Sequence, residues 1–330
     1  MTVADQSLLY IYIGKIFAVK EKQVYLEMEM EGEGVGDMSI LPESCVANVL
    51  SFTSPPDACR LSLISTIFKK AAESDTVWER FLPTDSQAIV FRSSQSSLLR
   101  SRISKKQLFF SLCDNPILID DGKMSFGLDK WSGKKCYMVA PRLLTIAWGD
   151  SPQYWQWVSD PNSRSIHSFI DNKQKVGTSS RSLSKYKGLH GCRFAEVAEV
   201  SAVGWFDIKG KINISMLSPA TLYKAYLVFK LTSRVSGFEN RPIEALVGLV
   251  GSESCKRTVY LDNRNARNRN DHNHPNNRGD GWLEIELGEF LNKGEDDYGE
   301  LEMGVLEVKR LYWKGGLVVQ GIEIRPKEGQ

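Results

Sequence analysis

The chain has 330 residues, of which 42% are apolar and 25% are charged, and its formal net charge is +2. This length predicts about two domains of ordinary globular protein, and the nearly balanced charge gives no support to a nucleic-acid-binding function. The six cysteines form no C-x-x-C pair, and the sequence has neither a cleavable signal peptide nor an apolar run long enough to span a membrane. We therefore expect a cytoplasmic or nuclear protein.

The amino-terminal segment is not expected to form a domain. Residues 27–37 are acidic and glycine-rich, which is the composition of a disordered segment. Either Met28 or Met30 would serve as a translation start. We therefore interpret residues 1–38 as a disordered extension, in which residues 1–27 either belong to the protein or precede its true start.

The next segment has the pattern of short helices. Leu41, Cys45 and Val49 recur every fourth residue, which places them on one face of a helix. A second helix is predicted after Ser54 and a third after Ser74, because serine is a favoured N-cap residue. Three short helices hold too little core to be robust alone, so we expect this unit to bind a partner through exposed apolar side chains.

Residues 85–125 are predicted to form a helical connector, and the pattern changes at residue 126. Residues 224–231 and 283–287 alternate apolar and polar side chains with a period of two, as strands with one buried face do. Repeated short strands without helices between them predict an antiparallel β-sandwich of jelly-roll character over residues 126–327. The expected fold is therefore multi-domain α + β.

Several motifs in these two regions resemble a known family. Leu41-Pro42-Glu43-Ser44-Cys45-Val46 and Ser74-Asp75-x-Val77-Trp78-Glu79 resemble an F-box. Tyr154-Trp155-x-Trp157, Trp205-Phe206-Asp207-Ile208 and Asp280-Gly281-Trp282 resemble the phloem lectins. The motifs occur in order on one chain, which is similar to plant F-box proteins of the phloem-lectin (phloem protein two, Nictaba-related) family.

The resemblance implies a role for the first domain, residues 39–84. An F-box of three helices would dock on a Skp-type adaptor and through it on a cullin and the ubiquitin-conjugating machinery. The chain would hold a target close to the ubiquitin donor, so we expect no catalysis and no cofactor or metal. The residues expected at the adaptor-binding face are Leu41, Pro42, Cys45, Val46, Val49, Leu50, Phe52, Leu61, Phe68 and Trp78.

The resemblance also implies a lectin function for the second domain. The apolar face of a pyranose stacks on an aromatic ring, and its hydroxyl groups need fixed hydrogen-bond partners. N-acetylglucosamine oligomers or N-glycans on a target are therefore expected to bind at Trp148, Trp155, Glu300 and Glu307. Packing in the core is the alternative for both tryptophans. We expect Trp205 and Trp282, which begin strands, in the core, and Trp157 is equally compatible with either role.

Residues 165–192 depart from the family pattern. They separate the Tyr154-Trp155-x-Trp157 motif from Phe194-x-Glu196, two motifs that are nearly adjacent in the family. We interpret this segment as an insertion, either a translated intron or a lineage-specific loop that would lie beside the sugar site.

Other functions agree less well with the residues. The sequence has no G-x-S-x-G motif of a hydrolase. His272 and His274 have few neighbouring residues able to complete a metal site, and the arginines of the asparagine-rich segment 261–281 have no interleaved aromatic residues to bind nucleic acid. Two alternatives stay open: the β-domain recognises a non-glycosylated protein, or the chain is a free-standing defence lectin. Neither nucleic acid nor a membrane is an expected partner.

Overall fold

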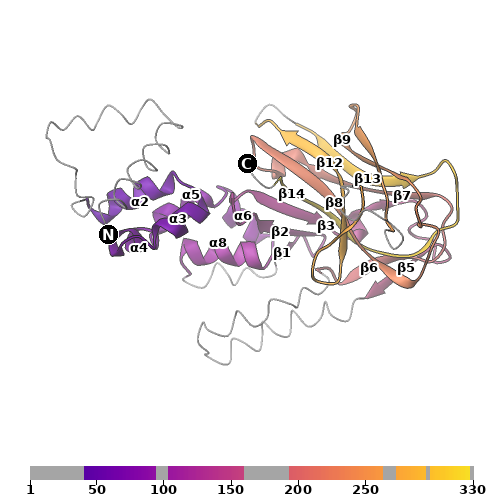
Figure 1. The fold of residues 1–330 in the computed structure, drawn as a ribbon, viewed down its shortest axis with the longest axis horizontal. Helices are drawn as coiled ribbons and strands as arrows, with labels where there is room; N and C mark the ends of the chain where they lie inside the picture. Colours follow the sequence, from indigo (N-terminus) through magenta and orange to yellow (C-terminus); the bar gives the residue numbers. More distant parts are fainter. Residues whose placement is uncertain (1–40, 94–102, 160–192, 263–272, 295–297, 328–330) are drawn as a thin grey trace, which may run out of the picture. The chain divides into compact units, whose positions relative to one another are not determined.

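The computed structural model describes residues 41–93, 103–159, 193–262, 273–294 and 298–327. The chain divides into two compact units, residues 1–81 and 82–330 (Figure 1). The predicted extension 1–38 and the predicted insertion 165–192 lie outside the described residues. In the part of the chain that the structure describes, no helix is long and apolar enough to cross a membrane.

The first unit is helical, but residues 41–81 form four short helices where the sequence predicted three. The helices are α2 (Glu43–Ser51), α3 (Pro55–Leu61), α4 (Thr66–Ala71) and α5 (Asp75–Phe81). The extra break occurs because Ser65 caps a new helix, its hydroxyl accepting a hydrogen bond from the backbone N–H of Phe68. Trp78 is fully buried among these helices, and its indole N–H donates to the carbonyl of Ala72 at 2.7 Å.

The second unit contains two antiparallel sheets, as the sequence predicted. The first sheet has the order β1 (Ile117–Ile119), β2 (Met124–Leu128), β3 (Lys135–Val139), β14 (Gly315–Pro326), β8 (Thr221–Ser236), β12 (Leu283–Asn292) and β11 (Asn276–Asn277), and β5 (Trp155–Ser159) joins it through β6 (Glu196–Val200), which pairs with β14. The second sheet has the order β10 (Cys255–Val259), β9 (Ile243–Leu249), β13 (Glu300–Glu307), β7 (Phe206–Asn213) and β4 (Thr145–Ile146).

The predicted connector is only partly helical. It contains α6 (Ser86–Phe91) and α8 (Lys105–Asp114), and α8 packs on β2. The apolar run Ile117–Ile119, however, pairs with β2 through Ile117 opposite Phe126 and forms the edge of the first sheet. The sandwich therefore begins before residue 126, because a short β-branched run next to a turn can complete a hairpin.

The core between the sheets follows the predicted alternation, with Leu227 and Phe229 fully buried. Val228 between them is also fully buried, although a period of two would expose it. It packs in a second cluster with Phe194 and Trp282, on the outer side of the first sheet. The segments that precede β6 and β12 therefore cover part of this outer face.

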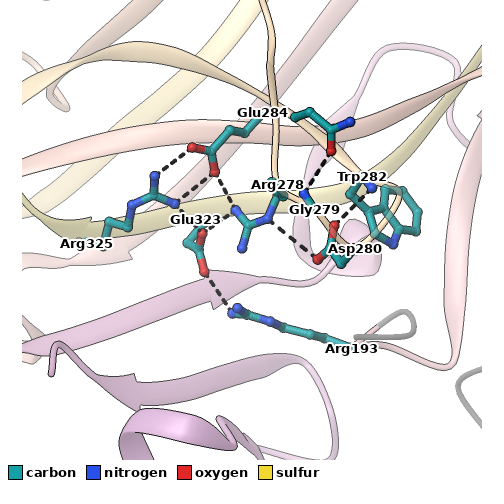
Figure 2. A network of polar contacts seen from close by, with 9 residues as sticks. Arg193, Arg278, Gly279, Asp280, Trp282, Glu284, Glu323 and Arg325 are labelled. Atoms are coloured by element: carbon teal, nitrogen blue, oxygen red, sulfur yellow. Dashed lines mark hydrogen bonds and ion pairs between the residues drawn. The ribbon is translucent and has the colours of Figure 1, made fainter. Parts of the chain in front are cut away.

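A network of buried charges fixes these covering segments to the sheet (Figure 2). Glu323 of β14 accepts hydrogen bonds from Arg193 (2.8 Å), Arg278 (2.6 Å) and Arg325 (2.9 Å). Glu284 of β12 binds both Arg278 and Arg325 (2.7 Å each at the closest approach). Burial alone would raise the pKa of the Glu323 carboxyl, but the three guanidinium groups outweigh it and hold the pKa well below its usual range.

Candidate functional site

Exposed aromatic side chains gather on the loops at one end of the sandwich. Trp148, Trp205 and Trp313 have exposed fractions of 60%, 47% and 67%. Isolated exposed apolar residues are ordinary, but a contiguous group of them marks a binding surface. We call this group the aromatic rim. It consists of the half-buried Tyr154, whose ring centroid is 6.1 Å from that of Trp148, and five exposed residues: Trp148, Trp205, Leu311, Tyr312 and Trp313.

The loop that carries Trp148 is fixed by two other tryptophans. The backbone N–H of Ala147 donates to the carbonyl of Asp207 at 3.0 Å, which extends the pairing of β4 with β7. The indole N–H groups of Trp155 and Trp157 donate to the carbonyls of Ala147 and Gly149, each at 3.0 Å. Trp148 lies between these two carbonyls with a left-handed backbone (φ +61°). Its ring is therefore presented to solvent by a loop held on both sides.

The other rim loops contact one another through their backbones. Val203 and Lys314 exchange two backbone hydrogen bonds of 2.8 Å, which places Trp205 near Trp313 in the fold. Gly237 has φ +79°, and a Cβ atom there would collide with the carbonyl oxygen of Trp313. The turn after β8 therefore approaches the β13–β14 loop so closely that only glycine fits.

Three buried aromatic rings form the base of the rim. Trp155 stacks on Phe206 with centroids 6.4 Å apart, and Phe206 meets Phe238 edge-on at 5.4 Å. Each ring belongs to a segment next to a rim loop: Trp155 follows Tyr154, Phe206 follows Trp205, and Phe238 follows Gly237. The rigid core thus sets the spacing of the loops above it.

A buried ion pair anchors the β13–β14 loop. The Lys314 ammonium, which is fully buried, lies 2.6 Å from Glu307 and also donates to the carbonyls of Tyr312 and Gly204. Glu307 accepts a further hydrogen bond from the backbone N–H of Arg310. Burial alone would raise the pKa of Glu307, but these hydrogen bonds outweigh it and lower the pKa. The loop is therefore ordered before any ligand arrives.

Known proteins resemble both units. A family model described as phloem protein 2 matches residues 134–169 and 175–326, and a model described as the F-box domain matches residues 38–80. The chain belongs to the phloem protein 2 family. It is 45% identical over 290 residues to the putative F-box protein PP2-B12 of Arabidopsis thaliana, covering 87% of this chain and 97% of that protein. It is 43% identical over 286 residues to F-box protein PP2-B10 of the same plant, covering 86% and 92%.

Solved structures resemble the phloem protein 2 domain only distantly. A structure of TmCBM61 in complex with beta-1,4-galactotriose aligns with 57% of this chain and 91% of its own, at 10% identity and a TM-score of 0.26. That similarity is too low to support an argument about a ligand. The two matched domain families, F-box and phloem protein 2, are typically non-catalytic.

The phloem protein 2 domain does not bring the four predicted sugar-binding residues together. Trp148 is exposed at the rim, but Trp155 is 1% exposed and belongs to the base, so it cannot stack on a sugar. Glu307 is at the rim end of β13, where its carboxylate forms an ion pair with Lys314. Glu300 is at the other end of β13. Seven residues of extended strand separate it from Glu307, a distance of about 23 Å. The structure therefore contradicts a stacking role for Trp155, leaves the Glu307 carboxylate paired with Lys314, and separates the exposed Glu300 from the rim.

The remaining tryptophans divide differently from expectation. Trp282 is buried, as predicted, but Trp205 is exposed because Phe206 takes the inward position at the start of β7. Trp157 is half-buried beneath the guanidinium of Arg142, 3.7 Å from its ring centroid. The sequence reasoning also missed Leu311–Trp313, although three large apolar residues between cations, outside any alternating pattern, are a signal of an exposed apolar loop.

One of the two histidines of the asparagine-rich segment, His274, lies within the described residues. No group of three histidine, cysteine, aspartate or glutamate side chains among them is placed to hold a metal. His274 instead packs against the ring of Tyr260, with centroids 5.0 Å apart, and His272 lies outside the described residues.

Only part of the predicted adaptor-binding set lies on the surface of the F-box. The buried members, which form the core around α5, are Val46, Leu50, Leu61, Phe68 and Trp78. Their prediction as contact residues is corrected, because a unit of four short helices needs its largest apolar residues to close its own core. Val49 is half-buried, and the exposed members are Leu41, Pro42, Cys45 and Phe52.

Two exposed apolar residues of the F-box were not predicted as contacts. Leu63 and Ile64, in the turn between α3 and α4, have exposed fractions of 86% and 39%. The ring of Phe52 lies under the Arg80 guanidinium, at 4.2 Å. Ile64 lies outside both helices, because α3 ends at Leu61 and α4 begins only after its N-cap, Ser65.

Proposed function

We propose that this chain is the substrate-recognition subunit of a Skp–cullin–F-box ubiquitin ligase. Its F-box docks on the Skp-type adaptor, and its aromatic rim binds glycans, N-acetylglucosamine oligomers or N-glycans, on the target protein. The observation that supports the glycan-binding part most directly is the solvent exposure of Trp148, Trp205 and Trp313 on loops that are held by buried contacts.

The chemistry of the rim suits a sugar. An indole ring offers a flat apolar face to the C–H groups of a pyranose and loses little conformational entropy on binding. Loops that are already ordered avoid a further entropic cost, and they keep the rings at fixed spacing. An oligosaccharide can contact two rings with successive units, so several exposed rings on one rim favour a chain over a single sugar.

We expect Trp148→Ala and Trp313→Ala each to weaken binding of chitotetraose at least tenfold, because each removes one stacking ring. Isothermal titration of the full chain measures this. The matched control is Trp131→Ala, which removes an exposed tryptophan (62% exposed) in the turn between β2 and β3 and should leave affinity unchanged. If the folded wild-type chain binds neither chitotetraose nor an N-glycan, glycan recognition is wrong and the F-box role is unaffected.

We expect Leu63→Asp and Phe52→Asp each to weaken binding to a Skp-type adaptor at least tenfold, because a carboxylate would be buried at an apolar interface. Leu63 is 86% exposed, so Leu63→Asp should change the free energy of unfolding little, whereas Phe52→Asp also removes the contact of the ring with Arg80 and should cost some stability. Leu291→Asp, at an exposed position on the β-domain (50% exposed), is the control for surface charge. Unchanged adaptor affinity in both F-box variants would place the docking face elsewhere.

A second candidate is recognition of a non-glycosylated protein. Leu311 supports it, because this residue has a left-handed backbone (φ +52°) and exposes an aliphatic side chain that a sugar would hardly use. Tryptophan, tyrosine and arginine are also frequent at protein interfaces. Competition separates the two: chitin oligomers or N-glycans should displace a glycosylated target and leave a bound protein segment in place. A free-standing defence lectin, in contrast, would not copurify with the adaptor.

A further inference from the structure

Two exposed cations begin the loop that carries half of the rim. Lys309 and Arg310 directly precede Leu311–Trp313. Among the described residues neither side chain has an ion pair or a hydrogen bond, and Arg310 uses only its backbone N–H, which donates to Glu307. Charges with no partner next to exposed aromatic rings are available to a ligand.

A third cation lies on the rim itself. The guanidinium of Arg241 is 3.7 Å from the ring centroid of Tyr312. It forms no ion pair with an acidic group among the described residues. Stacking on an aromatic face leaves the in-plane N–H groups of a guanidinium directed outward, and these suit the oxygens of a carboxylate or sulfate. Tyr312 therefore positions Arg241 as an anion-binding group at the edge of the rim.

Two acidic side chains, each two residues from one of these cations, are already engaged. Glu307 is bound by Lys314, and Glu239, next to Arg241 in the same turn, accepts the backbone N–H of Gly237. Asp207, whose pKa burial raises, lies 3.8 Å from Lys209, and its other oxygen is buried with no hydrogen-bond partner among the described residues. Asp150 is exposed, but it follows Trp148 on a different loop. The positive charge of the rim is thus concentrated on the side of Tyr312 and Trp313.

We propose that the rim selects an acidic saccharide, one that carries a carboxylate or sulfate group. Its sugar rings lie against Trp313 and Trp205, and its charged group is held by Arg241, Lys309 and Arg310. This inference rests on the proposed glycan-binding function and names the class of glycan, because a neutral chitin oligomer would leave all three cations unused.

The test compares neutral and acidic probes on the full chain by isothermal titration. Chitotetraose is the neutral probe, and 6-O-sulfated chitotetraose and tetragalacturonate are two acidic probes of different geometry. We expect at least one acidic probe to bind about tenfold more tightly than chitotetraose at low salt, and 0.5 M NaCl should remove most of that difference because it screens exposed charges. The double variant Lys309→Gln/Arg310→Gln keeps only Arg241 of the three cations and should lose most of the preference for the acidic probes, with its chitotetraose affinity unchanged.

The matched control is Lys69→Gln/Lys70→Gln, which removes two consecutive exposed lysines from α4 and should keep the preference. If chitotetraose binds but neither acidic probe binds more tightly, the acidic preference is wrong and glycan binding stands. If no saccharide binds, the proposed glycan function itself has failed. A poly-glutamate peptide that binds as tightly as the acidic saccharides would also overturn the inference, because negative charge alone, without a sugar ring, would then account for the binding.

Discussion

Replacing Glu323 by glutamine is expected to lower the free energy of unfolding by about 3–5 kcal/mol, because it removes the charge that three arginines share in a buried site. Arg278 is itself mostly buried, with a side-chain exposure of 13%, and it would keep only Glu284 and a longer contact with Asp280. Chemical denaturation followed by circular dichroism measures the loss. The control is Glu289→Gln, which removes a more exposed carboxylate paired with Lys327 and should cost less than about 1 kcal/mol.

The contribution of Glu323 should also depend on pH. Its folded-state pKa lies well below its usual range, so its stabilisation is fully present above the unfolded-state pKa of about 4.3. It is lost as the pH falls below that value towards the folded-state pKa, because the unfolded chain then binds the proton first. Glu323→Gln should therefore flatten the fall in stability below about pH 4. A variant as stable as the wild type at pH 7 would contradict the importance of the network.

Replacing Trp155 by alanine is expected to lower the free energy of unfolding by about 3–5 kcal/mol, because the side chain is almost completely buried against Phe206. The same change should abolish saccharide binding, although Trp155 is not expected to touch the ligand. Its indole N–H holds the carbonyl of Ala147, and without that hydrogen bond the loop of Trp148 loses one of its two anchors.

Trp155→Phe separates the two effects of this side chain. Phenylalanine keeps a ring on Phe206 but has no N–H group for the Ala147 carbonyl. We expect a stability loss of about 1–2 kcal/mol from the unpaired carbonyl and the smaller ring, together with clearly weaker chitotetraose binding. Stability is followed by denaturation and affinity by titration. A Trp155→Ala chain with wild-type stability and no saccharide binding would instead mean that Trp155 contacts the ligand directly.

Local patterns in the sequence determined the division into a helical unit and a β-unit. Serine and proline at helix starts and a period of four between apolar residues are properties of a few neighbouring residues, and so is the alternation in residues 224–231. These patterns are enough to assign secondary structure and to recognise the F-box and phloem protein 2 motifs. They failed where several weak signals competed, as at Ser65, which divides one predicted helix into two.

Only the tertiary structure decided which tryptophans face solvent and which carboxylates are available. Trp155 and Trp205 are both next to strand starts, yet one is buried beneath the rim and the other is exposed on it. Glu300 and Glu307 are the first and last residues of β13, so they lie at opposite ends of that strand. Only Glu307 forms an ion pair with Lys314. The physical reason is that burial and pairing depend on neighbours brought by distant segments. The sequence by itself therefore determined the kinds of residue available for binding, and the packing of the loops determined which of them form the rim.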